Sequence, residues 1–463
     1  MASVRYLGLI FGLIPLVASA ESTAPSIASS VAQVMRAGTR SDGPGVVVLV
    51  RQGNRTLYRG AQGKADIELD VPLEPDNIFR IGSVTKIFTA ALVVKMARAG
   101  ELSLDDSLQK YLPKFPNAEH ITLRELLNHT SGVADLTKNP TPGLMRSEAT
   151  TATLVADIAS RQPDFRPGSR WSYSNSGYIL LAAVIERITG APWHEALEKD
   201  VLIPLDLHHT TRDDDTKIVH SRALGYSTTD APYLVSRAAF ISMSVPSAAG
   251  ALLSNADDLA TSIQRLGHGA VIGPRGFAAM STPVRGIPGI TSATSYGLGL
   301  YLWTVRGQQL VGHTGQIDGF ASAVAYLPKH DITLVVLSND DNFDAKTMVK
   351  RLAALALGNP YPEVVGVTVP EATASALAGD YEADDHKKIS IVVKDGALYY
   401  SRVGHSMLLL QMTANGDLHF VPDDLSYLRP KASSAGGMVL EDVDDGEHIE
   451  RTFRKLITVN RSS

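Results

Sequence analysis

Apolar and polar positions follow a helical period in some parts of the chain and a strand-like period in others. Residues 26–37 have the composition of an amphipathic helix. Residues 45–51 and 56–59 read as strands on either side of Gly53-Asn54, which predicts a β-hairpin. Later runs rich in β-branched residues predict three more strands, at 309–313, 321–327 and 332–338, and a helix at 344–357.

The middle of the chain lacks a strand-like pattern, and residues 101 to about 290 read mainly as helices and long loops. Ser254-Asn255-Ala256-Asp257 resembles a capping box with aspartate in the glutamate position, and it predicts a helix through Leu259 and Ile263. Strands on both sides of a helical region favour a mostly antiparallel sheet flanked by helices. The predicted class is α+β, with a helical insertion.

The pattern changes again after residue 357. Residues 358–370 are predicted to be a linker that joins residues 21–357 to a second domain. Residues 371–463 give short strand-like runs, with turn signals at Asp395-Gly396, Asn415-Gly416 and Asp445-Gly446. We therefore expect a small C-terminal β-barrel or β-sandwich.

The composition favours a folded two-domain protein that acts on a small substrate. The chain has 463 residues, 44% of them hydrophobic, so it can bury a sizeable core. A net charge of −5 without a long basic run gives no electrostatic footprint for nucleic acid. Zero cysteines exclude disulfides and a cysteine nucleophile.

Residues 1–20 predict export. They combine a basic start, an apolar middle and the small residues Ala18-Ser19-Ala20, as in a secretory signal peptide cleaved after Ala20. The apolar part is short for a transmembrane helix, so we expect no stable membrane insertion after cleavage; the sequence leaves an uncleaved anchor open. A periplasmic or secreted bacterial enzyme fits these features best.

The candidate chemistry begins where one charged residue enters an apolar segment. Lys86 is the only charged residue between Arg80 and Lys95, and it follows Ser83 by three positions. On a helix that starts near Ser83, the two side chains can meet within one turn. Burial and the positive end of the helix dipole both favour a neutral lysine, which makes Lys86 a plausible general base for a Ser83 nucleophile.

A second SxxK pair, Ser107 and Lys110, lies in a charged stretch that ends at a proline and reads as solvated surface.

Three further patterns bear on the choice of Ser83. Tyr173-Ser174-Asn175 offers a phenol for proton transfer and an amide that can hold both a substrate carbonyl and the lysine. His313-Thr314-Gly315 lies at the end of a predicted strand, where glycine admits a substrate close to the backbone. For His129-Thr130-Ser131-Gly132 we expect a helix end and a turn, without chemistry.

Taken in this order, the patterns resemble the serine β-lactamase and penicillin-binding-protein superfamily, in its class C-like branch with D,D-peptidases, D-aminopeptidases and esterases. The resemblance covers about residues 26–357 and includes residues 126–132 and Asp105-Asp106 through Tyr111-Leu112-Pro113. It implies a β-lactamase-like fold. The C-terminal region resembles the small lipocalin-like barrel of some relatives, which either serves packing or oligomerisation or narrows access to the site.

The resemblance also implies a role for each matched residue. Ser83 attacks a carbonyl to form an acyl-enzyme, Lys86 and Tyr173 share proton transfer, and Asn175 positions the substrate. The backbone N–H groups of Ser83 and Gln316 form the oxyanion hole. Which of Lys86 and Tyr173 takes the first proton stays open.

His313, Thr314 and Gly315 are implied to bind substrate, with one departure from the family pattern. β-Lactamases of this branch usually have lysine at the position of His313, and a histidine is mostly neutral at pH 7. Efficient β-lactamase action is therefore not expected. We also expect activity on carboxylate-bearing substrates to change with pH near 6 to 7, around the ordinary imidazole pKa of ~6.5.

The predicted function is an exported serine hydrolase that cleaves a peptide or amide bond, with substrates containing D-amino acids favoured by analogy. The alternatives are a carboxylesterase of the same fold and a penicillin-binding sensor that acylates without turnover. The expected partner is a small peptide, amide or ester, and the sequence leaves homo-oligomerisation open. No cofactor or metal is expected, because His208-His209 and residues 213–215 lack regular ligand spacing.

Overall fold

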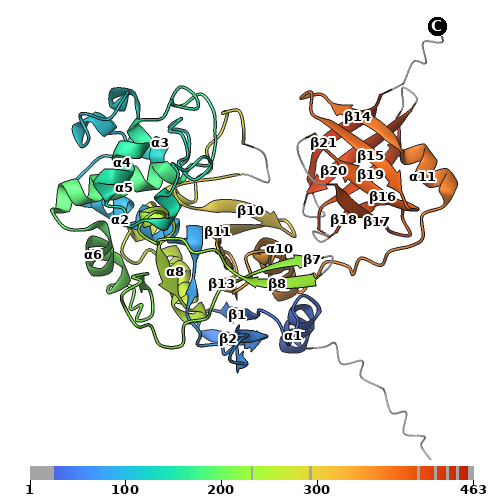
Figure 1. The fold of residues 1–463 in the computed structure, drawn as a ribbon, viewed down its shortest axis with the longest axis horizontal. Helices are drawn as coiled ribbons and strands as arrows, with labels where there is room; N and C mark the ends of the chain where they lie inside the picture. Colours follow the sequence, from blue (N-terminus) through green and yellow to red (C-terminus); the bar gives the residue numbers. More distant parts are fainter. Residues whose placement is uncertain are drawn as a thin grey trace, which may run out of the picture.

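A computed structural model describes residues 26–456, except for 231–232, 291–294, 404–406, 422–424, 434–436 and 445–447. The predicted signal peptide and the Asp445-Gly446 turn lie outside the described residues. Figure 1 shows a domain of helices around a sheet, followed along the chain by a β-barrel. The predicted α+β class and the C-terminal barrel are both confirmed.

The first domain is built on an antiparallel sheet with the strand order β10-β11-β12-β13-β1-β2. The predicted hairpin is confirmed, with Gly53 at a φ of 54° in the turn. β1 also pairs with β13, so that Val46 lies opposite Ser338 and the two ends of the domain meet. The strand bounds are β1 Val46–Gln52, β2 Arg55–Gln62, β10 Tyr301–Val305, β11 Gln308–Ile317, β12 Phe320–Leu327 and β13 Ile332–Ser338.

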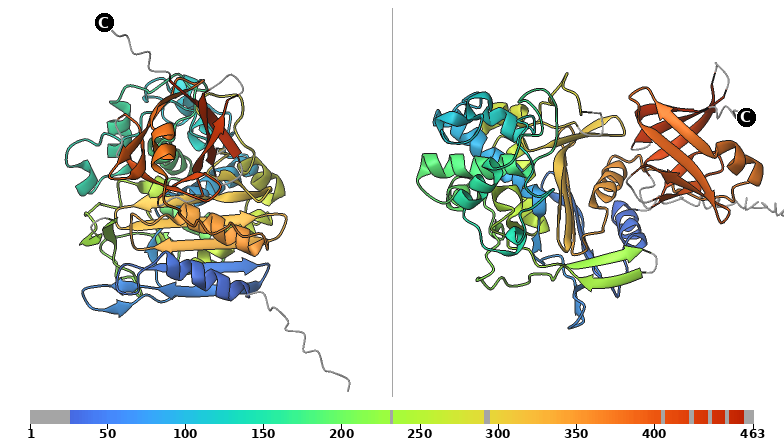
Figure 2. Two further views of the ribbon diagram at one scale, coloured as in Figure 1. Left: turned by 90° about the vertical axis from the view of Figure 1, so that its right-hand side faces the viewer. Right: turned by 45° about the horizontal axis from the view of Figure 1, so that its top comes forward.

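Both faces of this sheet are covered (Figure 2). The helices α1 (Ile27–Ala37) and α10 (Ala345–Ala356) pack on one face, in a core that includes Val46, Val48 and Val50. Val47 and Leu49 belong to a second core, which the larger helical part of the domain completes. β1 is apolar at successive positions because its alternate side chains enter two different cores.

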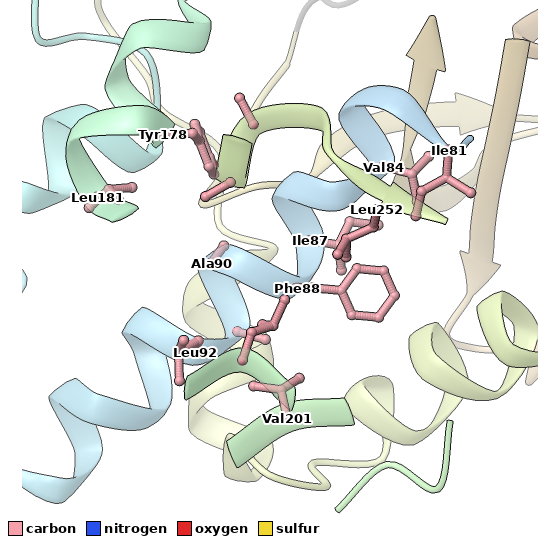
Figure 3. Packing of buried hydrophobic residues seen from close by; sticks show 14 of the residues in the cluster. Ile81, Val84, Ile87, Phe88, Ala90, Leu92, Tyr178, Leu181, Val201 and Leu252 are labelled. Carbon is pink, nitrogen blue, oxygen red and sulfur yellow. The ribbon is translucent and has the colours of Figure 1, made fainter. Parts of the chain in front are cut away.

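The helix α2 (Thr85–Ala99) runs through the second core, and most of its residues are buried. It packs against α5 (Asn175–Thr189), α7 (Ser247–Gly250) and α9 (Gly273–Met280). Figure 3 shows apolar side chains from several elements around it. A helix that is apolar on all sides is stable only when it is surrounded in this way, which fixes the lysine that it carries deep in the protein.

The predicted helical insertion is only partly correct, because short strands also lie within it. β9 (Leu252–Ser254) pairs with β5 (Phe79–Arg80) and β6 (Thr211–Arg212), and β7 (Tyr226–Asp230) pairs with β8 (Tyr233–Arg237). β5, β6 and β9 have only two or three residues each, which is too short to show a period of two. The other elements of this domain are β3 Lys64–Asp66, β4 Val71–Pro72, α3 Leu123–Leu127, α4 Thr151–Ala159, α6 Trp193–Leu197, α8 Ala256–Gly267, the 3-10 turns η1 Gly82–Val84, η2 Leu108–Lys110, η3 Ala118–His120 and η4 Leu144–Arg146, and the π-turn η5 Glu198–Leu202.

The start of α8 corrects the predicted capping box by one residue. Ser254 belongs to β9, and Asn255 is the N-cap, whose side chain accepts a hydrogen bond of 2.9 Å from the backbone N–H of Asp258. Asparagine is as good an N-cap as serine, so both assignments satisfy the same end of the helix. The helix itself passes through Leu259 and Ile263 as predicted.

The second domain begins with a helix that the sequence pattern did not predict, α11 (Glu371–Leu377), and continues as a closed antiparallel barrel. β14 pairs with both β15 and β21, which closes it. The turn between β15 and β16 contains Asp395 and Gly396, both with positive φ, as the Asp-Gly signal predicts. The barrel strands are β14 Gly379–Ala383, β15 Lys388–Lys394, β16 Ala397–Ser401, β17 Leu408–Met412, β18 Leu418–Phe420, β19 Tyr427–Ala432, β20 Met438–Asp444 and β21 His448–Lys455.

Candidate active site

Ser83 sits in the tight turn η1, directly before α2. Gly82 makes this turn with a φ of +48°, a conformation that other residues rarely adopt. A Cβ added to Gly82 would lie 3.0 Å from the backbone nitrogen of Gln316 and 3.1 Å from its carbonyl oxygen. The absence of a side chain at Gly82 therefore lets the Ser83 turn pack directly against β11.

Lys86 lies one turn after Ser83, and its side chain is completely buried. Its Nζ lies 3.0 Å from Ser83 Oγ and donates hydrogen bonds of 2.8 Å to Asn175 Oδ1 and to the Ala249 carbonyl. Burial lowers the pKa of Lys86 to about 7, although the negative charge of Asp135 opposes this shift. The i,i+3 spacing thus brings together a hydroxyl and a partly neutral amine, as predicted.

Asn175 is the first residue of α5, and its amide is held from both ends. Its oxygen faces Lys86, and its Nδ2 donates to Asp135 Oδ2 (3.2 Å) and to Thr137 Oγ1 (3.0 Å). Asp135 is buried and accepts two hydrogen bonds from Thr137 through its other oxygen. No sequence pattern indicates Asp135, which follows the predicted turn at 129–132 and is 40 residues from Asn175.

Tyr173 lies beside the amine, with its ring centroid 4.8 Å from Lys86 Nζ. Burial raises its pKa well above the ordinary value of 10, so the phenol keeps its proton. The second SxxK pair has no such surroundings, because Lys110 is exposed and bonds to Asp106 at 2.9 Å.

His129, for which no chemistry was expected, packs against Tyr173 with a centroid distance of 4.3 Å. It lies after α3 in a left-handed conformation, with a φ of 65°, so it also forms the predicted turn. Its Nδ1 accepts a hydrogen bond from the Ser174 N–H, and burial lowers its pKa well below the ordinary value. His129 is thus a neutral imidazole whose ring packs against the ring of Tyr173.

His313 is buried, and both ring nitrogens are engaged within the protein. Nδ1 lies 2.5 Å from the Thr314 carbonyl, so it carries the proton, and Nε2 accepts from the Tyr296 hydroxyl at 2.9 Å. Burial lowers the pKa of His313 to about 3, and the nearby Lys86 contributes. The expected titration of His313 between pH 6 and 7 is therefore wrong, because the site holds it as a neutral ring.

Tyr296 is a further residue that the sequence analysis missed. It is fully buried, and its ring contacts those of His129, Tyr301 and His313. Its sequence surroundings contain no repeated or charged pattern, so no local signal distinguishes it from an ordinary core tyrosine. These packed aromatic rings line the side of the site on which Tyr173 lies.

β11 forms the opposite wall of the site. A Cβ on Gly315 would lie 2.0 Å from the Ile81 carbonyl, so this glycine is required where the strand passes the Ser83 turn. β10 pairs with β11 only as far as Gly312, and residues 313–317 have no second partner strand among the described residues. This edge of β11 is therefore open to a bound substrate, although the Thr314 carbonyl already accepts a hydrogen bond from His313 Nδ1. An oxyanion hole made by the N–H groups of Ser83 and Gln316 stays a prediction.

The described residues contain no group of three or more metal-ligating side chains placed to hold a metal ion. Asp213, which the sequence places near His208 and His209, is bonded instead to Arg80 and Arg222. In the same part of the chain, no helix is long and apolar enough to cross a bilayer.

Comparison with known proteins assigns the chain to a family. The Beta-lactamase family model matches residues 31–358, and the chain belongs to this family. Penicillin-binding protein 4* of Bacillus subtilis is 25% identical over 388 residues, which cover 78% of this chain and 85% of that protein. Protein flp of Staphylococcus aureus is 26% identical over 321 residues, but the match spans only 62% of its length.

Solved structures show the same fold. A D-stereospecific amidohydrolase from Streptomyces sp. is 29% identical with a TM-score of 0.63, and the match covers 72% of this chain and 99% of that one. An octameric penicillin-binding protein homologue from Pyrococcus abyssi covers 92% of this chain and 99% of its own, with 22% identity and a TM-score of 0.66. At this identity the second likeness concerns the fold alone.

Proposed function

We propose that the protein is a serine hydrolase that cleaves an amide or peptide bond through an acyl-enzyme on Ser83. The observation that carries this proposal is the 3.0 Å contact between Ser83 Oγ and the buried amine of Lys86, whose pKa of about 7 leaves it partly neutral at neutral pH. A buried neutral amine next to a hydroxyl is the arrangement that activates a serine without a histidine.

The hydrogen bonds around Lys86 favour it over Tyr173 as the first proton acceptor. A neutral amine has two N–H donors and one lone pair. Asn175 Oδ1 and the Ala249 carbonyl take the two donors, so the lone pair is directed at the Ser83 hydroxyl. Tyr173 keeps its proton because its pKa is raised, and it is a poor acceptor until it has given that proton away.

The proposed reaction follows from these positions. Lys86 accepts the Ser83 proton as Oγ forms a bond to the substrate carbonyl carbon, and the N–H groups of Ser83 and Gln316 stabilise the oxyanion. Tyr173 donates its proton to the leaving amine as the C–N bond breaks, and it regains a proton from Lys86. Water then attacks the acyl-enzyme with the same groups as base and acid, which releases the acid and restores Ser83.

The choice of an amide substrate rests on similarity as well as on geometry. The amidohydrolase that is 29% identical to this chain is described as D-stereospecific, and this supports a D-aminoacyl amide or D-peptide as the substrate. Neutral His313 supplies no fixed positive charge for a substrate carboxylate, which speaks against efficient β-lactamase action.

A substrate panel tests the proposed function. Purified protein is incubated with D- and L-aminoacyl p-nitroanilides, p-nitrophenyl esters, a D-Ala-D-Ala peptide and a chromogenic cephalosporin, and the Ser83→Ala variant is the control. Ser83-dependent turnover of D-configured amides or peptides would support the proposal. Turnover of esters alone would replace it with a carboxylesterase, and a stable adduct of the protein without product would replace it with a sensor.

We also propose that the protein is exported to the periplasm or secreted, because residues 1–20 have the pattern of a signal peptide. N-terminal sequencing of the protein isolated from its bacterial host tests this. A mature chain that begins at Glu21 would support export, whereas an intact Met1 in the cytoplasmic fraction would contradict it.

A further inference from the structure

A pocket of about 270 Å³ lies beside the Ser83 turn and has no part in the proposed chemistry. Arg80, three residues before Ser83, and Asp318, two residues after Gln316, both line it. Two aromatic rings contribute to its wall: Phe320, which is buried, and Phe240, which is 58% exposed. The pocket therefore combines an apolar wall with charged groups, at the end of β11 that passes the Ser83 turn.

The positive charges of this pocket are already neutralised. Arg80 and Arg222 both bond to Asp213, at 2.7 and 2.8 Å, and Arg80 also pairs with Asp215 at 3.6 Å. Arg237 bonds to Glu68 at 2.5 Å. None of the three guanidinium groups is left as a free cation for an anionic ligand.

Asp318 differs from these paired groups. Among the residues that the structure describes, its half-buried carboxylate has neither a hydrogen bond nor an ion pair. The neighbouring Asp341 accepts hydrogen bonds from Ser227 Oγ and from the Gly319 N–H, without a cation. Burial and Asp341 raise the pKa of Asp318, and the attraction of Arg80 opposes this only in part. The pocket thus has unmatched negative charge.

The proposed chemistry sets the direction in which a substrate lies along β11. Tyr173, the proposed acid, is near His313, with 6.2 Å between the ring centroids, so the leaving amine must lie at that end of the site. The strand then passes Gly82 at Gln316 and ends at Ile317, directly before Asp318. The acyl part of the substrate, on the other side of the scissile bond, therefore extends toward the pocket.

We infer that this pocket is a subsite for the first residue of the substrate, in which Asp318 binds a free α-ammonium group and the rings of Phe240 and Phe320 contact an apolar side chain. The inference rests on the proposed function and narrows the class of substrate. The substrate is an aminoacyl amide or a peptide cleaved after its first residue. A peptide or amide whose α-amino group is blocked is then a poor substrate.

Binding to an inactive protein tests this inference separately from turnover. In the Ser83→Ala background, calorimetry at about pH 6, where the amine carries its proton, compares D-phenylalaninamide with hydrocinnamamide, which lacks only the amine. We expect D-phenylalaninamide to bind about tenfold tighter. Adding Asp318→Asn is expected to bring the ratio close to one. Adding Asp214→Asn removes the same charge from a carboxylate bonded to Thr216 outside the pocket, and is expected to leave the ratio intact.

Equal binding of the two ligands, a ratio that survives Asp318→Asn, or no measurable binding of D-phenylalaninamide would overturn the inference. Turnover by the unmodified protein separates this failure from that of the proposed function. If Ser83-dependent hydrolysis is equally fast on free and N-acetylated D-phenylalanine p-nitroanilide, the hydrolase proposal stands and the subsite is wrong. If no member of the substrate panel is hydrolysed, the proposed function fails and the subsite inference falls with it.

Discussion

The amide oxygen of Asn175 accepts a 2.8 Å hydrogen bond from the buried amine of Lys86, while the amide nitrogen faces Asp135. Asparagine can present either end of its amide, so a lone Lys86–Asn175 contact would not fix the orientation. The acceptors Asp135 and Thr137 on the nitrogen side remove that freedom. Asp135 therefore acts on the Lys86 amine in two ways: it orients Asn175, and it raises the pKa of Lys86.

Replacing Asp135 is expected to change both the rate and its pH dependence. Asp135→Asn removes the charge that raises the pKa of Lys86, so the acidic limb of kcat/KM should move to lower pH. Loss of a charged hydrogen-bond partner should also reduce kcat/KM about tenfold. Thr137→Val is the matched control, because it removes one hydrogen bond from Asn175 and keeps the charge. If both variants shift the limb equally, or neither does, Asp135 has only a structural role.

Replacing Ser83, the proposed nucleophile, should abolish turnover without unfolding the protein. Ser83→Ala is expected to lower turnover about a thousandfold or more, because alanine has no side-chain oxygen that could carry the acyl group. Intact-protein mass spectrometry should find no adduct, and thermal unfolding should stay close to that of the unmodified protein. Turnover that persists in this variant would show that Ser83 is not the nucleophile.

The pH profile of the unmodified protein should report the titration of Lys86. Below its pKa of about 7 the amine is protonated and cannot accept the Ser83 proton, so kcat/KM should fall as the pH decreases through 7. Initial rates between about pH 5 and pH 9 at low substrate concentration measure this limb. A flat profile through pH 7 would exclude Lys86 as the base.

His313 should have no part in that limb. Its pKa of about 3 leaves it neutral over the working range. In His313→Gln, the amide can replace the hydrogen bonds to Tyr296 and to the Thr314 carbonyl in part, so kcat/KM should fall while the shape of the profile between pH 5 and pH 8 is unchanged. Disappearance of a limb near pH 6 to 7 in this variant would show that burial does not hold the ring neutral.

Gly82 tests the close contact between the Ser83 turn and β11. Gly82→Ala adds a Cβ at a φ of +48° and 3.0 Å from the Gln316 nitrogen, so it should lower the unfolding free energy by about 1 to 2 kcal/mol and also reduce kcat/KM. Gly100→Ala is the control, since its φ is +78° but no atom lies within 4 Å of the added Cβ. It should destabilise by about 1 kcal/mol and leave kcat/KM unchanged. Denaturant unfolding measures the stability of both variants, and initial rates measure their kcat/KM. Equal kcat/KM for the two variants would show that the contact between Gly82 and Gln316 does not affect activity.

Local patterns in the sequence determined much of the fold and the centre of the site. The spacing of Ser83 and Lys86 already places both side chains on one turn, because three residues make nearly one helical turn. The single charge in the apolar run predicts a buried, partly neutral amine, and the helix packs as that pattern requires. The hairpin at Gly53 and the barrel turn at Asp395 follow from glycine and aspartate, which tolerate positive φ.

Only the tertiary structure decided which distant residues surround that amine, and with what charge. Asp135, His129 and Tyr296 contact the site across sequence gaps that no helical or strand period spans. The same packing buries His313, so desolvation overrides the ordinary imidazole pKa from which the sequence argument started. Short-range spacing fixes which neighbouring side chains meet, whereas burial and long-range contacts depend on the whole fold, and these set the protonation states on which the chemistry rests.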